Sequence, residues 1–150
     1  MAKYVFQYSK EDLKAPGNQK WTDIAMEFAN QLQMNIKHKF GLFSYAFSEE
    51  DGAEITDGCE GMGKDWFNFR FHIFMGQAIY IDCINVPYEW RGKGIGFYLI
   101  EQIKAFAKEN GLAYVFLGSY EPSNPFWERC GFKKINDYPD FVVGIDGTAK

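Results

Sequence analysis

This 150-residue sequence has few of the residues that build metal sites and disulfide frameworks. It contains three cysteines, Cys59, Cys83 and Cys130, and two histidines, His38 and His72. An odd number of widely spaced cysteines favours free thiols in a reducing compartment over a set of disulfides. Neither histidine has a cysteine at the spacing of a zinc site. We therefore expect a cytoplasmic protein that holds no metal.

Long apolar runs and an excess of positive charge are also missing. No stretch approaches the roughly 18 apolar residues of a membrane helix, and the N-terminus lacks the apolar core of a signal peptide. The 20 Asp and Glu residues outnumber the 16 Lys and Arg residues, for a net charge of −4. Because nucleic-acid binding normally depends on clustered positive charge, we expect partners that are neither membranes nor nucleic acids.

Apolar residues are abundant, at 47% of the sequence, and include 15 Phe, 9 Tyr and 4 Trp. A chain of this length usually forms one domain, and no repeat or long linker divides it. Residues 1–150 are therefore expected to form a single domain with an aromatic-rich core.

Hydrophobic spacing predicts a mixed order of strands and helices. Apolar residues on one helical face predict a helix from Trp21 to Phe40 and another from Ile95 to Asn110. A short helix is expected at 124–130. Strands are predicted at 4–8, 42–47, 66–75, 78–86, 112–118 and 141–145. This order is typical of an α/β fold.

The predicted strand 66–75 alternates most clearly between apolar and polar residues. Such alternation is typical of a strand that buries one face. On the polar face, His72 is more easily explained as a partly exposed strand residue than as a catalytic one. The apolar face would carry Phe67, Phe69, Phe71, Ile73 and Met75, and the polar face Asn68, Arg70 and His72.

Between Glu49 and Asp65 the sequence turns acidic and rich in glycine. Seven carboxylates stand there against one lysine, which gives the segment a charge of −6 and leaves the remaining sequence at +2. We expect a connection between two strands. Its charge could draw a cationic amine to a nearby site, or it could simply keep a solvated hairpin soluble.

The clearest candidate for a binding site is Arg91-Gly92-Lys93-Gly94-Ile95-Gly96, between a predicted strand and a predicted helix. Glycines allow backbone N–H groups to converge, and a helix N-terminus favours anions. With Arg91 and Lys93 as cationic partners, these residues predict a phosphate or pyrophosphate site. The alternative is a plain strand-to-helix connection. The segment ends neither as a P-loop nor with the three-glycine dinucleotide pattern.

Two stretches, Ile81–Gly96 and Phe126–Phe132, resemble the GNAT superfamily of N-acetyltransferases. The first is similar to the family's Arg/Gln-x-x-Gly-x-Gly/Ala acyl-CoA motif, and the second (Phe-Trp-Glu-Arg-Cys-Gly-Phe) to its closing aromatic segment. The resemblance covers residues 78–132. It implies a GNAT-like mixed central sheet of about six to seven strands, flanked by about four helices. It also implies acetyl-CoA as co-substrate.

The resemblance assigns roles by position. The backbone of Ile84 and Val86 would pair with the pantetheine arm of CoA, and an amide near Val86 would polarise the acetyl carbonyl. Asn124 is similar to a family asparagine that contacts the CoA arm. The reaction would be direct attack of an amine on the thioester in a ternary complex. The backbone amides that would hold the pyrophosphate belong to Arg91, Gly92, Lys93, Gly94, Ile95 and Gly96.

Direct attack requires a neutral amine, so a base must take a proton from the ammonium form. The family's usual base positions fall here on Asp82 and Tyr80. Asp82 interrupts an apolar strand, where burial would raise the pKa of its carboxyl. We predict Asp82 as the base, acting directly or through water. The alternative is that it only pairs with Arg70 or another cation on a neighbouring strand.

The family's usual general acid, a tyrosine, is replaced here by Trp127, whose indole cannot donate a proton near neutral pH. We predict Tyr120 as the substitute, with Tyr88 and Cys130 as alternatives. Unassisted departure of the CoA thiolate is also possible. The missing tyrosine leaves a second function open, a catalytically weak or inactive acyl-CoA-binding module.

The expected acceptor is a small-molecule or peptide amine. Cationic candidates such as a polyamine, an aminoglycoside or a lysine-bearing peptide are favoured by the acidic segment. Family members are commonly monomers or homodimers, and the sequence permits either.

Overall fold

The computed structural model describes residues 18–59, 65–118, 124–134 and 140–145. In these residues seven strands form one sheet, in the order β1-β2-β3-β4-β5-β7-β6. β4 and β5 run parallel and the other described pairs are antiparallel, so the mixed α/β fold is confirmed. The strands are β1 (Tyr45–Glu49), β2 (Gly52–Thr56), β3 (Asn68–Phe74), β4 (Ala78–Asn85), β5 (Tyr114–Gly118), β6 (Lys133–Lys134) and β7 (Asp140–Gly144).

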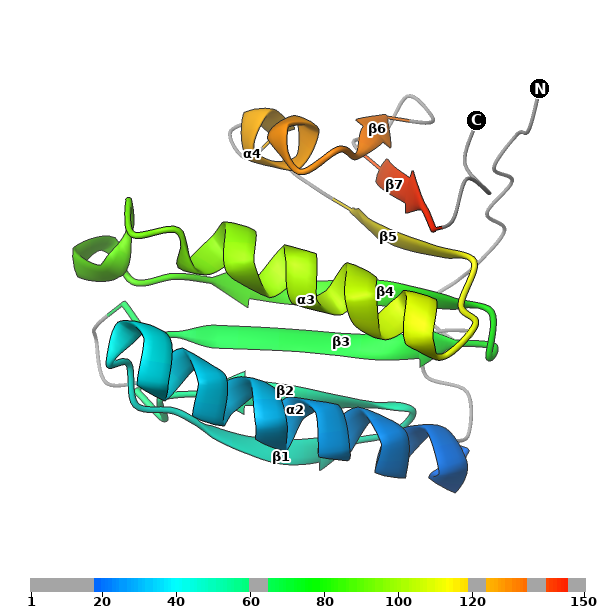
Figure 1. Cartoon of the computed structure of the whole chain (residues 1–150), viewed down its shortest axis with the longest axis horizontal. Helices are drawn as coiled ribbons and strands as arrows, with labels where there is room; N and C mark the ends of the chain where they lie inside the picture. The colour runs from blue at the N-terminus through cyan, green and yellow to red at the C-terminus, as the bar shows by residue number, and fades with distance from the viewer. Residues whose placement is uncertain (1–17, 60–64, 119–123, 135–139, 146–150) are drawn as a thin grey trace.

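Within the described ranges there are three α-helices, against the expected four or so, and one short 3-10 helix. Figure 1 shows α2 and α3 side by side on one face of the sheet, with α2 over β1 and β2 and α3 over β4. These helices are α2 (Gln19–Phe40), α3 (Ile95–Glu109) and α4 (Asn124–Arg129), and the 3-10 helix is η1 (Tyr88–Trp90).

The two long helices form where the apolar spacing predicted them. α2 begins after Asn18, whose side-chain oxygen accepts the N–H of Lys20 at 3.0 Å. It ends at Gly41, which takes a left-handed φ of 80° and donates its N–H to the carbonyl of Lys37. α3 ends at Glu109 with Asn110 as its C-cap, within one residue of the prediction.

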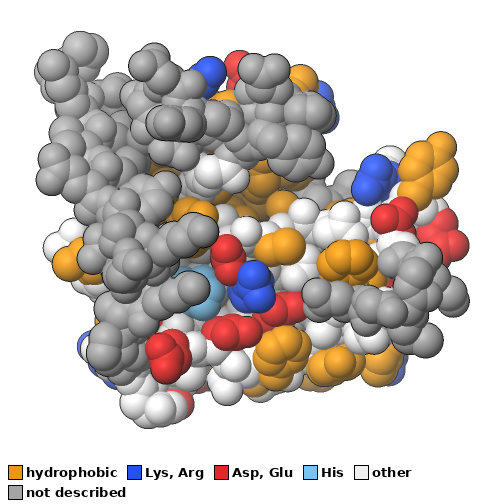
Figure 2. Space-filling view, turned by 180° about the vertical axis from the view of Figure 1, so that it is seen from behind, with side chains coloured by type: hydrophobic (Ala, Val, Ile, Leu, Met, Phe, Trp, Pro, Cys, Tyr) orange, Lys and Arg blue, Asp and Glu red, His pale blue; other side chains and the backbone are white. Residues whose placement is uncertain are grey.

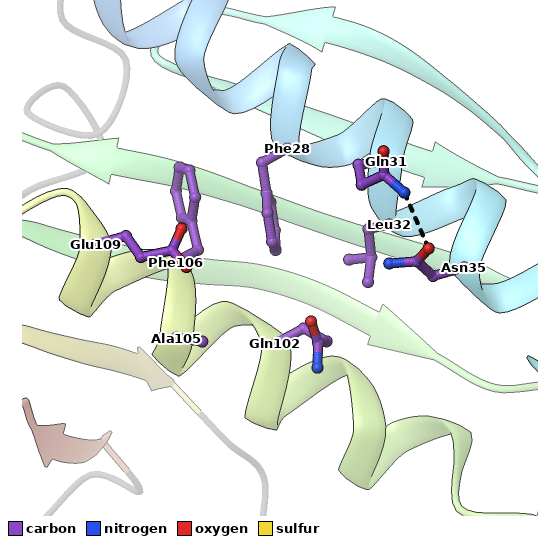
Figure 3. A pocket seen from close by; sticks show the side chains of 8 residues that line it. All are labelled: Phe28, Gln31, Leu32, Asn35, Gln102, Ala105, Phe106 and Glu109. Carbon is purple, nitrogen blue, oxygen red and sulfur yellow. Dashed lines mark hydrogen bonds between the residues drawn. The ribbon is translucent and has the colours of Figure 1, made fainter.

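Aromatic rings fill the space between the helices and the sheet. Phe28 of α2 stacks on Phe106 of α3 with ring centroids 4.3 Å apart, and Figure 3 shows both rings between the two helices. A small cavity of about 190 Å³ lies beside them, with a rim that includes the Gln31–Asn35 hydrogen bond of 3.0 Å. The fully buried apolar face of β3 packs beneath and includes Phe71.

One residue of that predicted face was placed wrongly. Met75 is 73% exposed, with a φ of 52°, because β3 ends at Phe74 and the chain turns there to enter β4. On the predicted polar face of β3, Arg70 and His72 are partly exposed as expected, whereas Asn68 is buried.

The acidic segment is not only a connection, because β2 lies within it. All five residues of β2 are buried, between β1 and β3. Gly52 is needed there, since a Cβ would stand 2.0 Å from the carbonyl oxygen of Phe71. The strand predicted at 42–47 instead begins at Tyr45, and the two-residue β6 was not predicted. The strand predicted at 4–8 lies outside the described residues.

Candidate functional site

The sheet opens between its two parallel strands. β4 and β5 pair from Ala78–Tyr114 to Ile81–Leu117 and then separate. Beyond Ile81, β4 continues to Asn85 with β3 on one edge and no described strand on the other. That free edge borders a groove of about 850 Å³. Backbone N–H and C=O groups there remain available to an extended ligand.

The groove brings together most of the residues that the motif singled out. Its walls are the end of β4, the glycine turn with the start of α3, and α4. Lys93 does not line it; its ammonium lies 5.0 Å from the centroid of the Trp90 ring. The predicted residues that do line it are Ile84, Val86, Arg91, Gly92, Gly94, Ile95 and Gly96, together with Asp82.

Two glycines of the turn allow its left-handed backbone conformation and leave open space around it. Gly92 and Gly94 take left-handed φ values of 78° and 86°, and a Cβ on either would meet nothing within 4 Å. Close packing therefore does not require them. They allow the chain to turn sharply while leaving the approach to α3 unobstructed.

The N-terminus of α3 is not capped by its own sequence. Gly94 occupies the cap position, no side chain caps the helix there, and the first turn carries no acidic residue. The first N–H groups of a helix have no partner within the helix. At α3 they face the groove with the positive end of the helix dipole, which is an arrangement that binds anions.

Gly96 and Arg91 hold the turn in place. A Cβ at Gly96 would stand 3.3 Å from the ring of Phe126, so this glycine lets α4 approach α3 closely. The Arg91 Nε donates a hydrogen bond of 2.7 Å to the carbonyl of Val86. Its guanidinium also lies 6.0 Å from the ring centroid of Tyr88. The turn is thereby tied back to the end of β4.

A β-bulge brings Asp82 to the groove. Arg70 pairs with Cys83 and Phe71 with Ile81, so Asp82 is an extra residue in β4. Both Asp82 and Cys83 therefore lie beside Arg70, on the sheet face opposite α2 and α3. Figure 2 shows this face, where acidic side chains gather around a basic side chain and a histidine.

Asp82 is paired with two cationic groups from β3. Its Oδ2 lies 2.5 Å from the Nε of Arg70 and 3.7 Å from the Nε2 of His72. The contact with His72 lowers the pKa of Asp82; burial opposes this, and the charge of Arg70 adds to the lowering. The expectation of a raised pKa is therefore wrong, because burial is outweighed. The pairing with Arg70 that we weighed as the alternative is present, and the role of Asp82 as base stays a prediction.

Glu54 also pairs with Arg70, which no pattern in the sequence indicated. Glu54 is buried in β2, where its carboxylate lies 3.3 Å from Arg70 Nη1 and accepts a hydrogen bond of 3.0 Å from Asn68. The thiol of Cys83 donates to the Asn68 oxygen at 2.9 Å, and burial raises its pKa. Glu54 stands opposite Arg70 only because β2 pairs with β3.

Other carboxylates of the acidic segment also serve the fold. Asp57 accepts the backbone N–H groups of Cys59 and Phe67 at 3.0 and 3.1 Å, and Asp65 accepts that of Tyr88 at 3.3 Å. Among the described residues that line the groove, Asp82 is the only carboxylate. In the described part, the segment therefore adds no acidic side chain to the groove wall.

The groups expected to protonate the leaving thiolate differ in their surroundings. Trp127 is 4% exposed and packs edge-on against Phe126 and Phe132. Cys130 lines the groove, and burial raises its pKa to about 11. Tyr88 is 77% exposed. Tyr120 and the side chain of Asn124 lie outside what the structure describes, so both assignments stay predictions.

Two other features are absent from the described ranges. They hold no group of three or more metal-ligating side chains of His, Cys, Asp or Glu. None of the helices found there combines the length and apolar character that crossing a membrane demands.

Known sequences match the segment that contains the groove. The profile of the acetyltransferase (GNAT) family matches residues 58–132. Glucosamine 6-phosphate N-acetyltransferase 1 of Dictyostelium discoideum is 32% identical over 59 residues, and the glucosamine 6-phosphate N-acetyltransferase of Candida albicans is 33% identical over 58. Each match takes in 39% of this chain, and it spans only 38% and 39% of those relatives' lengths.

Solved structures match the whole architecture at low sequence identity. Tetrahymena GCN5 aligns over 88% of this chain and 91% of its own, with a TM-score of 0.52 and 12% identity. A GNAT family acetyltransferase of Staphylococcus aureus aligns over 88% and 98%, with a TM-score of 0.51 and 12% identity. These likenesses concern the fold alone. The family match over residues 58–132 leads to one conclusion: the chain belongs to the GNAT acetyltransferase family.

Proposed function

We propose that this protein is an acetyl-CoA-dependent N-acetyltransferase that acts on a primary amine by direct attack in a ternary complex. One observation carries the proposal. The free edge of β4 and the uncapped start of α3 meet at a single groove, which Asp82 also lines. A ligand with amide groups at one end and phosphates at the other would find backbone partners along β4 for its amides and at the start of α3 for its phosphates.

The proposed position of CoA follows the groove walls. The pantetheine amides would pair with the free backbone edge near Ile84 and Val86, as an added strand does. The pyrophosphate would accept N–H groups from the glycine turn and the first turn of α3, beside Arg91. A backbone amide near Val86 would donate to the oxygen of the acetyl carbonyl, where negative charge develops during attack.

Acetyl transfer then requires a neutral amine at the Asp82 end of the groove. The amine lone pair attacks the thioester carbonyl carbon, the C–S bond breaks, and CoA leaves as a thiolate. A thiol of pKa about 8.5 is a tolerable leaving group even without help. Tyr120 stays our predicted proton donor to the thiolate, and Asp82 our predicted route for the proton that leaves the ammonium.

We infer two classes of acceptor for the first screen. The curated relatives are named for an amino sugar phosphate, so we propose small amino sugars as the first acceptors to test. Cationic amines, which the acidic segment favoured, come second because Asp82 is the only described carboxylate lining the groove, beside Arg91 and Arg129. Both classes carry the primary amine that the proposed reaction requires.

A weaker or inactive acyl-CoA-binding module is the second candidate. The buried Trp127 at the family's tyrosine position favours it, since no proton can come from there. The two functions share the groove and differ only in turnover.

The test begins with calorimetric titration of acetyl-CoA and of CoA into the protein. Binding is the expected result for both ligands. Release of the CoA thiol is then followed with glucosamine 6-phosphate, glucosamine, spermidine, an aminoglycoside and a lysine peptide. Turnover with one class establishes the transferase. Binding without turnover selects the binding module, and absence of binding overturns both.

A further inference from the structure

We propose that the Oδ1 atom of Asp82 receives the acceptor ammonium and that His72, set back from the groove, is the final acceptor of its proton. This inference rests on the proposed function. It makes His72 a positioning residue that acts through Asp82, although the sequence pattern explains it as an ordinary strand residue.

The two oxygens of Asp82 have different surroundings. The contacts from Arg70 and His72 both go to Oδ2. No hydrogen bond or ion pair to Oδ1 occurs in the part of the chain that the structure describes, and the Asp82 side chain lines the groove with 32% of its surface exposed. One oxygen is therefore anchored, while the other is available to a hydrogen-bond donor in the groove.

The hydrogen bonds of the imidazole fix where its proton sits. Nδ1 of His72 lies 3.0 Å from the carbonyl oxygen of Glu50. A carbonyl can only accept, so Nδ1 carries a hydrogen in every protonation state. In the neutral ring, the lone pair of Nε2 then faces Oδ2 of Asp82 at 3.7 Å. A proton at this point turns a repulsion between two acceptors into an attraction between opposite charges.

The charges around His72 favour holding that proton. Asp82 on β4 and Glu49 on β1 place negative charge near His72. Arg70, on the same strand as His72, binds Asp82, and Tyr80 of β4 stands opposite His72 in the sheet. Burial lowers the pKa of His72, but the contacts with Asp82, the Glu50 carbonyl and Glu49 outweigh it, so the pKa is raised. Neutral His72 is thus a better proton acceptor than Asp82, whose pKa is lowered.

The proposed step balances without another reactant. An N–H bond of the ammonium breaks and its proton passes to Oδ1 of Asp82. The protonated carboxyl then turns about its Cβ–Cγ bond and brings the same O–H to His72. That O–H bond breaks as an Nε2–H bond forms on the neutral ring, and the carboxylate pairs with Arg70 again. The freed amine lone pair attacks the thioester carbon. After turnover, His72 returns its proton to solvent, because 19% of its side chain is exposed.

The experiment compares pH–rate profiles of the wild type, H72Q and H38Q with the best amine from the screen. Glutamine retains a donor for the Glu50 carbonyl but cannot take a proton. His38, in the last turn of α2, provides the matched control. In the wild type and H38Q, kcat should rise with pH around the raised pKa of His72. In H72Q that limb should disappear and kcat should fall at least about tenfold, with KM for acetyl-CoA unchanged.

Two further measurements separate proton transfer from packing. In H72A, added imidazole should restore kcat in proportion to its concentration, which a purely structural role would not produce. In the free protein, NMR titration of the His72 ring should give a lower pKa in D82N than in the wild type.

The outcomes are distinct. Turnover with the same pH profile in H72Q and the wild type overturns the relay and leaves the transferase. A loss of activity in H72A that imidazole does not restore also overturns the relay. Acetyl-CoA binding without turnover of any amine overturns the proposed transferase, and the relay with it.

Discussion

The two long helices of this protein begin in opposite ways. α2 starts behind Asn18, whose side chain accepts the N–H of Lys20 and so caps the helix from within the sequence. α3 starts behind Gly94, with no side-chain cap. The first helix end is complete without a ligand. The second leaves its donors facing a groove, at the cost of the stability that a cap gives.

This difference separates a helix that serves the fold from one that also serves a site. Both helices bury an apolar stripe against the same sheet, so packing does not account for their different starts. A mutation at the start of α2 should therefore change stability alone, and one at the start of α3 should change ligand affinity first.

The largest effect is expected for Gly94→Glu. A carboxylate there would stand in open space at the start of α3, where the phosphates of CoA are proposed to lie. We expect the affinity for CoA to fall at least about 100-fold through like-charge repulsion and blocked access. Calorimetric titration measures it.

Gly111→Glu is the matched control for that variant. Gly111 has a φ of 70° and open space like Gly94, but it follows the C-terminal end of α3. Similar backbone strain should leave CoA affinity within about twofold. Equal losses of CoA affinity in the two variants would contradict a phosphate site at the start of α3.

Arg91→Ala should give the next largest effect. It removes a charged partner for the phosphates and the hydrogen bond to the Val86 carbonyl, so CoA affinity should fall roughly tenfold. S-acetylpantetheine, which lacks the phosphates, should lose less affinity. Lys93→Ala is the comparison: its ammonium lies over Trp90 and outside the groove, so its effect should be smaller. A larger loss of CoA affinity for Lys93→Ala than for Arg91→Ala would contradict the proposed position of the phosphates.

Asn18→Ala tests the capped helix. The substitution removes the acceptor for the Lys20 N–H and should lower the free energy of unfolding by about 1 kcal/mol. Urea denaturation measures this change. CoA affinity of the folded variant should match that of the wild type, and a weakened affinity would show that the two helix ends are not independent.

The smallest effect is expected from the loss of the pairing between Asp82 and His72. Its lowered pKa makes its contribution to stability present above about pH 4 and lost as pH falls through that lowered pKa. The raised pKa of His72 makes its contribution present below about pH 6.5 and lost as pH rises through that raised pKa.

Asp82→Asn should therefore destabilise most between these limits, by less than about 1 kcal/mol because the pair is partly exposed. Urea denaturation at pH 3, 5.5 and 9 measures the difference from the wild type. Glu27→Gln on the exposed side of α2 serves as control. A constant difference across the three pH values would contradict the coupling of Asp82 to His72.

The sequence predicted those parts of the fold that repeat a period over many residues. α2, α3 and β3 each show enough regularly spaced apolar residues to be recognised alone. β2 has only five residues, and its Glu54 is buried solely because Arg70 and Asn68 lie opposite in β3. Such a strand depends on its neighbours, so its own composition does not reveal it.

The sequence predicted the part of the site that the backbone of the glycine turn forms. It did not predict the part that depends on how β3 and β4 are aligned. The glycines between a strand and a helix identified the turn and the start of α3. The direction of the Asp82 pKa shift was missed because it depends on a bulge that sets this residue beside Arg70 and His72. No feature of the strand sequence itself predicts a one-residue change in register.

The short β4–β5 pairing also bears on how the molecule holds together. Four strands lie on one side of this seam and three on the other, and only four residue pairs join β4 to β5. A ligand bound along the free edge of β4 would stabilise the junction between β4 and β5. At 100 times its dissociation constant it would add about 2.7 kcal/mol to the free energy of unfolding. Hydrogen exchange at the β4–β5 seam should therefore slow more on CoA binding than exchange at the β1–β2 hairpin.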